Sequence, residues 1–184
     1  MRSRSKAWRV LTVLGLAAAA MGPLTAAQGA QSSPVESDAT YEIRSQASGK
    51  CLDVKDASEA NGAPIVQWTC NGGTNQRFRL FQEPNGYWSF RTFAHKFLAV
   101  KDIENALDGS PITQIAESDT TEANSTFDIV WDQVTADVYR IWVPANDANR
   151  FFDVKDGSQA DGAPIIQYVR TEGPNQLFKM VKVA

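Results

Sequence analysis

Residues 51–78 read CLDVKDASEANGAPIVQWTCNGGTNQRF, and residues 151–178 read FFDVKDGSQADGAPIIQYVRTEGPNQLF. The two stretches are identical at 15 of 28 positions without a gap. Agreement at this density indicates internal duplication, which constrains the architecture more than any other feature of the chain.

A third, more divergent copy lies between these two stretches. It keeps FLAVKD at residues 97–102, DGSPI at residues 108–112, and Phe127, which matches the last residue of the other copies. We therefore predict three units, which cover about residues 41–86, 87–138 and 139–184.

Each unit has the pattern of short β-strands. Apolar or alternating runs are separated by Gly and Asn, as at Asn61-Gly62 and Asn85-Gly86, and no segment keeps a helical period for long. This pattern predicts about twelve short strands in all. Three such units are too few for a propeller and must share one core, so we predict a closed, pseudo-threefold, all-β domain.

The start of the 184-residue chain differs from the rest. Four basic residues precede an apolar run, and small residues follow at Thr25, Ala26 and Ala27. This order predicts a secretory signal peptide over residues 1–27, with cleavage after Ala27 or Ala30. The apolar run is shorter than the roughly 20 residues that span a bilayer, so a secreted protein without membrane insertion is expected. Residues 28–40 are small and polar and are expected to form a flexible leader.

The charge of the secreted form differs from that of the whole chain. The chain has a net charge of −3, but four of its 18 Lys and Arg residues lie in the expected signal peptide. Its removal leaves 14 Lys and Arg against 21 Asp and Glu, a net charge of −7. Such a domain repels polyanions, so nucleic acid is not an expected partner.

Cys51 and Cys70 are the two cysteines of the chain. In a secreted chain a pair at this spacing favours a disulfide, which would stabilise the fold by roughly 3 kcal/mol. A zinc site or a redox pair are the alternatives. No histidine lies nearby to complete a zinc site, and a redox pair is more often C-x-x-C.

The units resemble the ricin B-type lectin repeat, a carbohydrate-binding module with the β-trefoil fold. The resemblance covers all three units and rests on CLDV at residues 51–54, QWTC at residues 67–70 and NQRF at residues 75–78. The last is the Q-x-W signature with Phe in place of Trp, at a position expected to face the core. The resemblance also implies that Cys51 pairs with Cys70.

The resemblance implies a sugar site in the first unit and another in the third. In the first, Asp53 would accept hydroxyls, Asn75 would donate, Trp68 would stack on the sugar ring and Gln76 would hold Asp53, with Gln67 as a further candidate. The corresponding residues of the third unit are Asp153, Asn175, Tyr168, Gln176 and Gln167. These residue types suit a sugar, which presents hydroxyl groups at its edge and C–H groups on one face.

Each candidate also has a structural interpretation. The two aspartates could cap turns, the aromatic rings could belong to the core, and Gln76 and Gln176 could brace the loop. In the middle unit Ala99 replaces the aspartate, Ile115 the ring and Ser125 the glutamine. We therefore predict two binding units and one structural unit.

These features predict a non-catalytic lectin for glycans or polysaccharides of galactose, mannose or xylose type, neutral because the domain is acidic. Hydrolysis of a glycoside requires two carboxylates at close range, whereas Asp53 and Asp153 lie in different units. No metal site or cofactor is expected. The alternative is a secreted trefoil that binds a protein partner such as a protease, since a fold does not fix a function.

Overall fold

The computed structural model describes residues 35–101, 107–131, 137–144 and 149–183. Twelve strands form one connected sheet in these residues and confirm the all-β prediction. The strands are β1 (Ala39–Ser45), β2 (Cys51–Val54), β3 (Ile65–Trp68), β4 (Phe78–Gln82), β5 (Trp88–Arg91), β6 (Phe97–Val100), β7 (Ile112–Ile115), β8 (Asp128–Trp131), β9 (Val138–Val143), β10 (Arg150–Val154), β11 (Ile165–Val169) and β12 (Phe178–Lys182).

The helices are single turns. They are η1 (Lys55–Ala57), η2 (Thr74–Gln76), η4 (Glu117–Asp119), α1 (Glu122–Ser125), η6 (Lys155–Gly157) and η7 (Pro174–Gln176). Among the described residues, no helix has the length and apolar character needed to cross a membrane.

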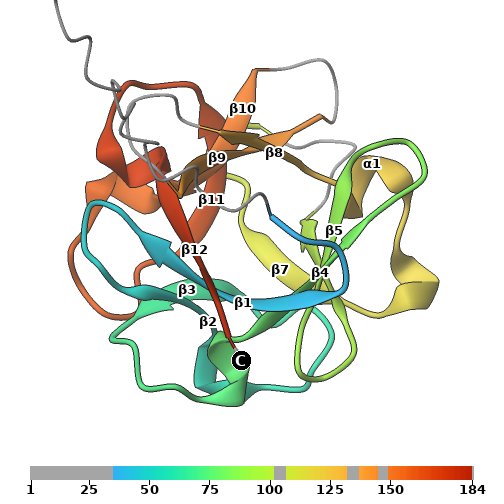
Figure 1. The fold of residues 1–184 in the computed structure, drawn as a ribbon. Coiled ribbons are helices and arrows are strands. Elements are labelled where there is room, and N and C mark those ends of the chain that lie inside the picture. The colour runs from blue at the N-terminus through green and yellow to red at the C-terminus, as the bar shows by residue number, and fades with distance from the viewer. Residues whose placement is uncertain (1–34, 102–106, 132–136, 145–148, 184) are drawn as a thin grey trace, which may run out of the picture. The chain divides into compact units, whose positions relative to one another are not determined.

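The strands β1, β4, β5, β8, β9 and β12, which Figure 1 labels, form a closed barrel. β1 pairs with β12 and with β4, β4 pairs with β5, and β9 pairs with both β8 and β12. A bridge between Trp88 and Phe127 joins β5 to β8 and completes the circle. Each unit contributes its first and last strand to the barrel, so the barrel cannot close without all three units.

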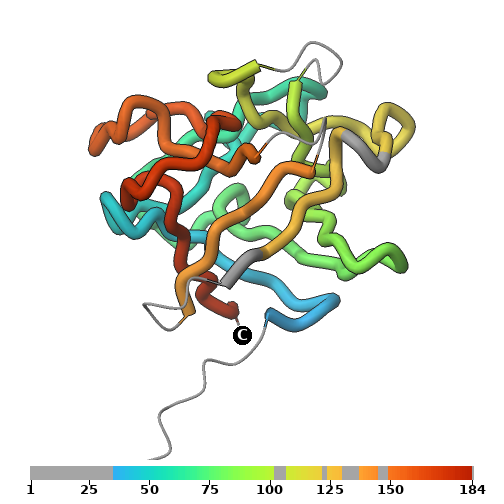
Figure 2. The backbone as a smooth tube through the Cα atoms, turned by 90° about the horizontal axis from the view of Figure 1, so that it is seen from above, coloured from blue at the N-terminus to red at the C-terminus, as the bar shows by residue number. Residues whose placement is uncertain are grey.

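The other six strands form three hairpins, β2–β3, β6–β7 and β10–β11, that cap one end of the barrel. Isolated bridges connect each hairpin to the next, and the backbone trace of Figure 2 passes through the three units in turn. The bridges are Pro64 to Thr113, Pro111 to Ile166, and Val66 to Pro164. A barrel capped by three hairpins related in this way is a β-trefoil.

The core contains the three signature phenylalanines, Phe78, Phe127 and Phe178, which are all fully buried. The Phe127 ring packs edge-on against Phe152 at 4.9 Å and against Phe90 at 5.6 Å between centroids. The expectation that the signature position faces the core is confirmed. Burial of one such side chain contributes roughly 1.5–3 kcal/mol, which explains why the drifted middle unit still keeps Phe127.

The chain before β1 differs from the expected leader. β1 begins at Ala39, and Val35 packs against the core. The Glu36 amide donates to the Tyr41 hydroxyl at 2.8 Å, so residues 35–40 are held to the domain. The expected signal peptide and residues 28–34 lie outside the described residues, so these predictions stay untested. Asp102, the last residue of the FLAVKD match in the middle unit, also lies outside them.

A ring of three buried glutamines connects the hairpins. The Gln67 side-chain amide donates to the carbonyls of Ser158 and Ala160 in the third unit, at 2.7 and 2.9 Å. Gln114 donates in the same way to Ser58 and Ala60 in the first unit, at 2.7 and 3.0 Å. Gln167 donates to the Leu107 carbonyl in the second unit at 3.1 Å and closes the ring.

The backbones of these glutamines strengthen the same contacts. The Gln114 amide donates to the Ala63 carbonyl at 2.9 Å, and the Gly62 amide donates to the Gln114 carbonyl at 2.7 Å. Gly62 has φ 81°, a conformation that glycine adopts without strain. The Asn-Gly and Asp-Gly pairs therefore form the turns to which the buried glutamines bind. The primary amides of Gln67 and Gln114 each use both N–H donors, on two carbonyls of another unit.

We predict that Gln114→Ala lowers the free energy of unfolding by about 1–3 kcal/mol, because two carbonyls lose their donor. Chemical denaturation followed by tryptophan fluorescence measures this change. Gln46→Ala, which truncates an exposed glutamine, should leave the stability unchanged. Equal stability of the two variants would contradict a role for the glutamine ring.

Candidate functional site

The third unit has a hollow of about 470 Å³ beside the β10–β11 hairpin. Asp153 pairs with Ile166 and Phe151 with Tyr168, so Asp153 and Tyr168 lie on the same face of the hairpin. The turn η7 brings Asn175 to the same place. The hollow is lined by Asp153, Asp156, Gly157, Ile166, Tyr168, Thr171, Gly173 and Asn175.

Asp153 is held by two amides. Asn175 Nδ2 and Gln176 Nε2 both donate to its Oδ2 atom, at 2.8 and 2.9 Å. Gln176 also donates to the Val169 carbonyl and accepts from the Thr171 amide, which fixes the loop between β11 and η7. The other carboxylate oxygen, Oδ1, takes no hydrogen bond from the described residues and is available as an acceptor for a ligand.

The first unit repeats this arrangement with one difference. Gln76 Nε2 donates to Asp53 Oδ2 at 2.8 Å, which is the contact that the resemblance implies. Asn75, in contrast, donates to the Val54 carbonyl at 3.3 Å, so its amide is turned differently from that of Asn175. The Asn75 amide still lies close enough to Asp53 to lower the pKa of this carboxyl, as the Gln76 amide does.

Both aspartates have a pKa that is raised from the ordinary value of an aspartate. Burial raises the pKa of Asp53 and of Asp153, since it penalises the charged carboxylate. The hydrogen bonds from Gln76 and Gln176 oppose this effect but do not cancel it. The site therefore holds a partly desolvated carboxylate, whose capacity to accept hydrogen bonds from hydroxyls is reduced when it is protonated.

The two candidate stacking rings lie at the surface. Trp68 is 41% exposed and Tyr168 is 39% exposed, so neither is a core residue. In the first unit, Thr69 beside Trp68 donates its amide to Asp161 at 2.8 Å, and the Lys50 ammonium lies 2.7 Å from the same carboxylate. The Lys50 hydrogen bond holds the pKa of Asp161 below its usual value. A turn of the third unit thus holds the backbone next to the Trp68 side chain of the first unit.

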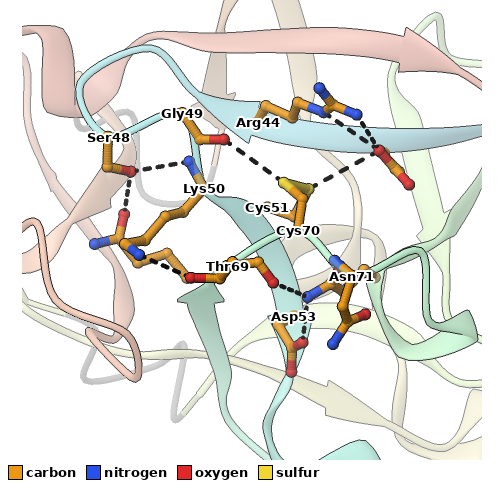
Figure 3. Close-up of a disulfide and its surroundings, with 12 residues drawn as sticks. Arg44, Ser48, Gly49, Lys50, Cys51, Asp53, Thr69, Cys70 and Asn71 are labelled. Atoms are coloured by element: carbon orange, nitrogen blue, oxygen red, sulfur yellow. Dashed lines mark hydrogen bonds and ion pairs between the residues drawn. A yellow bond between two sulfur atoms is a disulfide. The ribbon is translucent and has the colours of Figure 1, made fainter.

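The disulfide between Cys51 and Cys70 is present, as expected. Figure 3 shows how it ties the start of β2 to the loop after β3, close to Asp53 and Thr69. The third unit has Phe151 and Arg170 at these positions and forms the same hairpin without a disulfide.

The middle unit lacks this arrangement. Ala99 is fully buried in β6, opposite Thr113, where the other units carry the aspartate. The helix α1 replaces the turn η2, and the Ser125 hydroxyl donates to the Thr121 carbonyl at 2.7 Å.

Gln67 and Gln167 are not brought to the site. They are 0% and 2% exposed and belong to the glutamine ring. Successive residues of a strand point to opposite faces, so the glutamine next to Trp68 or Tyr168 must point away from it. Their assignment as sugar contacts is therefore corrected to a structural one.

Several residues of the site were missed by the sequence analysis. Ile166, Asp156 and Thr171 line the third-unit hollow, and Gly73 and Gly173 make room for the site asparagines. A Cβ atom added to Gly73 would lie 2.5 Å from Asn75 Oδ1. The signal in the sequence was Gly-x-Asn-Gln, which the first and third copies share and the middle copy lacks.

The comparisons with known proteins agree with this geometry. The family model for the ricin-type β-trefoil lectin domain-like family matches residues 28–115. ThreeFoil, a designed threefold-symmetric protein, is 30% identical, with a TM-score of 0.70 over 78% of this chain and 99% of its own. The chain belongs to the ricin-type β-trefoil lectin-like family.

Two further structures show the range of proteins that contain this fold. The ricin B-like lectin of Macrolepiota procera, solved with lactose, is 20% identical, with a TM-score of 0.69 over 82% of this chain and all of its own. An exo-β-1,3-galactanase from Clostridium thermocellum is 30% identical, with a TM-score of 0.71. That match covers 81% of this ricin-type chain but only 31% of the enzyme.

We predict that Asp53→Asn with Asp153→Asn does not lower the thermal midpoint at pH 7. Asparagine keeps an oxygen that accepts from Gln76 or Gln176 and removes a desolvated charge. A raised pKa means that the folded protein holds its proton more tightly than the unfolded chain, so this carboxylate costs stability as pH rises through that pKa. The advantage of the variant should therefore grow from acid to neutral pH. Thermal scans across this range test the sign, and an advantage that shrinks would contradict the prediction.

We also predict that Cys51→Ala with Cys70→Ala lowers the free energy of unfolding by about 3 kcal/mol while the fold is kept. The first site should lose more ligand affinity than the third, since only its loop is tied by the disulfide. Denaturant titration and near-ultraviolet circular dichroism measure stability and fold. An unchanged stability would show that the loop is held by its other contacts.

Proposed function

We propose that this protein is a secreted, non-catalytic lectin in which the first and third units each bind one sugar. The observation that carries the proposal is the pair of carboxylates, Asp53 and Asp153, each fixed through Oδ2 by a glutamine while Oδ1 is left for a ligand. A surface ring lies on the same hairpin face in both units. A fixed acceptor beside an exposed ring suits the hydroxyl edge and the C–H face of a sugar.

We propose a galactose-type ligand. The Macrolepiota procera lectin was solved with lactose, and another similar structure is that of an exo-β-1,3-galactanase. The third-unit site is an open hollow, and the stacking rings of both units lie at the surface, so we expect a dissociation constant of about 1 mM per site, equivalent to about −4 kcal/mol. Two such sites on one rigid body gain affinity when they engage the same polysaccharide.

Secretion and absence of catalysis are part of the same proposal. The N-terminal signal-peptide pattern supports secretion, and the disulfide fits an oxidising compartment. Asp153 shares its hollow with Asp156, so hydrolysis deserves a direct test. Incubation with a β-1,3-galactan should release no reducing sugar, and release that depends on Asp153 would contradict a purely binding role.

The decisive prediction concerns the two aspartates. Titration calorimetry with lactose should give two sites per chain, one site after either Asp53→Ala or Asp153→Ala, and none after both, because each loss of a charged acceptor weakens binding at least about tenfold. Glu59→Ala removes the same charge from an exposed turn and should bind normally.

The double variant Asp53→Asn with Asp153→Asn is expected to stay folded, so a loss of binding in it is not caused by a loss of structure. A folded protein retained by no sugar on a glycan array would overturn the proposed function, and binding that survives both Asp→Ala changes would overturn the sites.

A further inference from the structure

A second hollow, of about 240 Å³, lies beside the first site and is rich in arginine. We call it the basic hollow. It is lined by Thr40, Thr74, Arg77, Arg79, Arg91, Thr92, Phe93 and His95. Positive charge gathered in one hollow is unexpected in a chain with more acidic than basic residues.

The strand register places the arginines together. β4 and β5 lie side by side in Figure 1, and Arg79 is directly opposite Arg91. Arg77 precedes Arg79 by two residues, which brings it to the same side of the chain. Like charges at opposed positions of a β-ladder are unfavourable, so the fold by itself gives no reason for this arrangement.

Aromatic rings hold two of the guanidinium groups. The Arg79 and Arg91 groups lie 5.2 and 5.5 Å from the centroid of Phe81, and Arg91 also lies 4.5 Å from that of Phe97. Stacking of this kind restricts the side chains, so less conformational freedom is lost when an anion binds.

The acidic residues nearby neutralise this charge only in part. Asp38 lies 2.6 Å from Arg79, but both side chains are more than half exposed. Glu117 approaches Arg91 only to 3.7 Å and is 73% exposed. Exposed ion pairs of this type are weak and exchange readily with other anions. Arg77 has no acceptor for its guanidinium group in the described ranges, and its Nε atom is buried without a partner, like that of Arg91.

The third unit supplies an internal comparison. At the positions of Thr74 and Arg77 it has Pro174 and Leu177. Lys179 takes the place of Arg79, and the arginine opposite it, Arg44, is neutralised by Glu42 at 2.6 Å. The basic hollow is therefore a property of the first unit and not of the repeat.

The turn η2 connects the basic hollow to the sugar site. Thr74 lines the hollow, while the next two residues, Asn75 and Gln76, belong to the site of Asp53. The basic hollow and the sugar site therefore share the turn η2.

We propose that the first unit binds saccharides that carry a carboxylate or sulfate group, which the basic hollow receives through the outer nitrogen atoms of Arg77, Arg79 and Arg91. Guanidinium groups form charge-assisted, paired hydrogen bonds with both groups. The third unit binds the neutral counterpart. This inference rests on the proposed function, because the sugar ring itself is held at Asp53.

The test isolates the first site in an Asp153→Ala background. Calorimetry at low salt compares lactose with its 3′- and 6′-sulfates and with 3′- and 6′-sialyllactose, which carries a carboxylate. At least one acidic ligand should bind about tenfold more tightly than lactose, and the gain should shrink at 0.5 M NaCl (about 4 Å screening length). The sulfate and sialyl arms identify which group the hollow prefers.

Arg77→Leu introduces the residue of the third unit, so the fold has already accepted it in a matching copy. This change should remove the gain and leave lactose affinity unaltered. Arg170→Leu removes the same charge from an arginine paired with Glu172, outside the basic hollow, and should keep the gain.

Each other outcome overturns a defined part. Equal affinity for neutral and acidic ligands, or a gain that survives Arg77→Leu, refutes the basic hollow as a subsite and leaves the lectin function intact. Failure of lactose and all its derivatives to bind even the unmodified protein refutes the galactose-type function as well. Displacement of the acidic sugar by a short polyglutamate peptide with equal affinity would refute a saccharide as the specific occupant.

Discussion

The fold depends on the contacts that pass from each unit to the next through Gln67, Gln114 and Gln167. Each unit is too small to enclose a core, and its hairpin leaves a turn whose carbonyls need donors. The glutamines supply those donors across unit boundaries and close a ring. Each of these turns takes a donor from a neighbouring unit, so the three units stabilise one another.

This dependence separates structure from binding within a single strand. In β3, the side chain of Gln67 is buried in the ring of three glutamines, and the next residue, Trp68, points to the surface. The middle unit could therefore lose its aspartate and its aromatic ring while it kept Gln114 and Phe127. Residues that all three units keep are therefore best explained by the fold. Residues that only the first and third units keep are the candidates for ligand binding.

The sequence allowed prediction of the all-β class and the strand number from the repeated strand pattern, and of the disulfide from the cysteine spacing. Through the family resemblance, it also allowed prediction of the buried Phe78 and of the bond between Gln76 and Asp53. It did not allow prediction of contacts between units. The role of Gln67 was mistaken because the two carbonyls that accept from its side chain lie more than 90 residues away. The hydrogen bond from the Thr69 amide to Asp161 also joins distant parts of the sequence. The start of β1 was placed too late since the small, polar residues before Tyr41 carry no strand pattern.

The seam between β1 and β12 has a mechanical consequence. Tyr41 pairs with Lys182 and Ser45 with Phe178, so the two strands enter and leave the barrel at the same end. A pulling force between these ends would load the hydrogen bonds one after another, as in a zipper, instead of shearing them together. The barrel should therefore open at modest force along this seam.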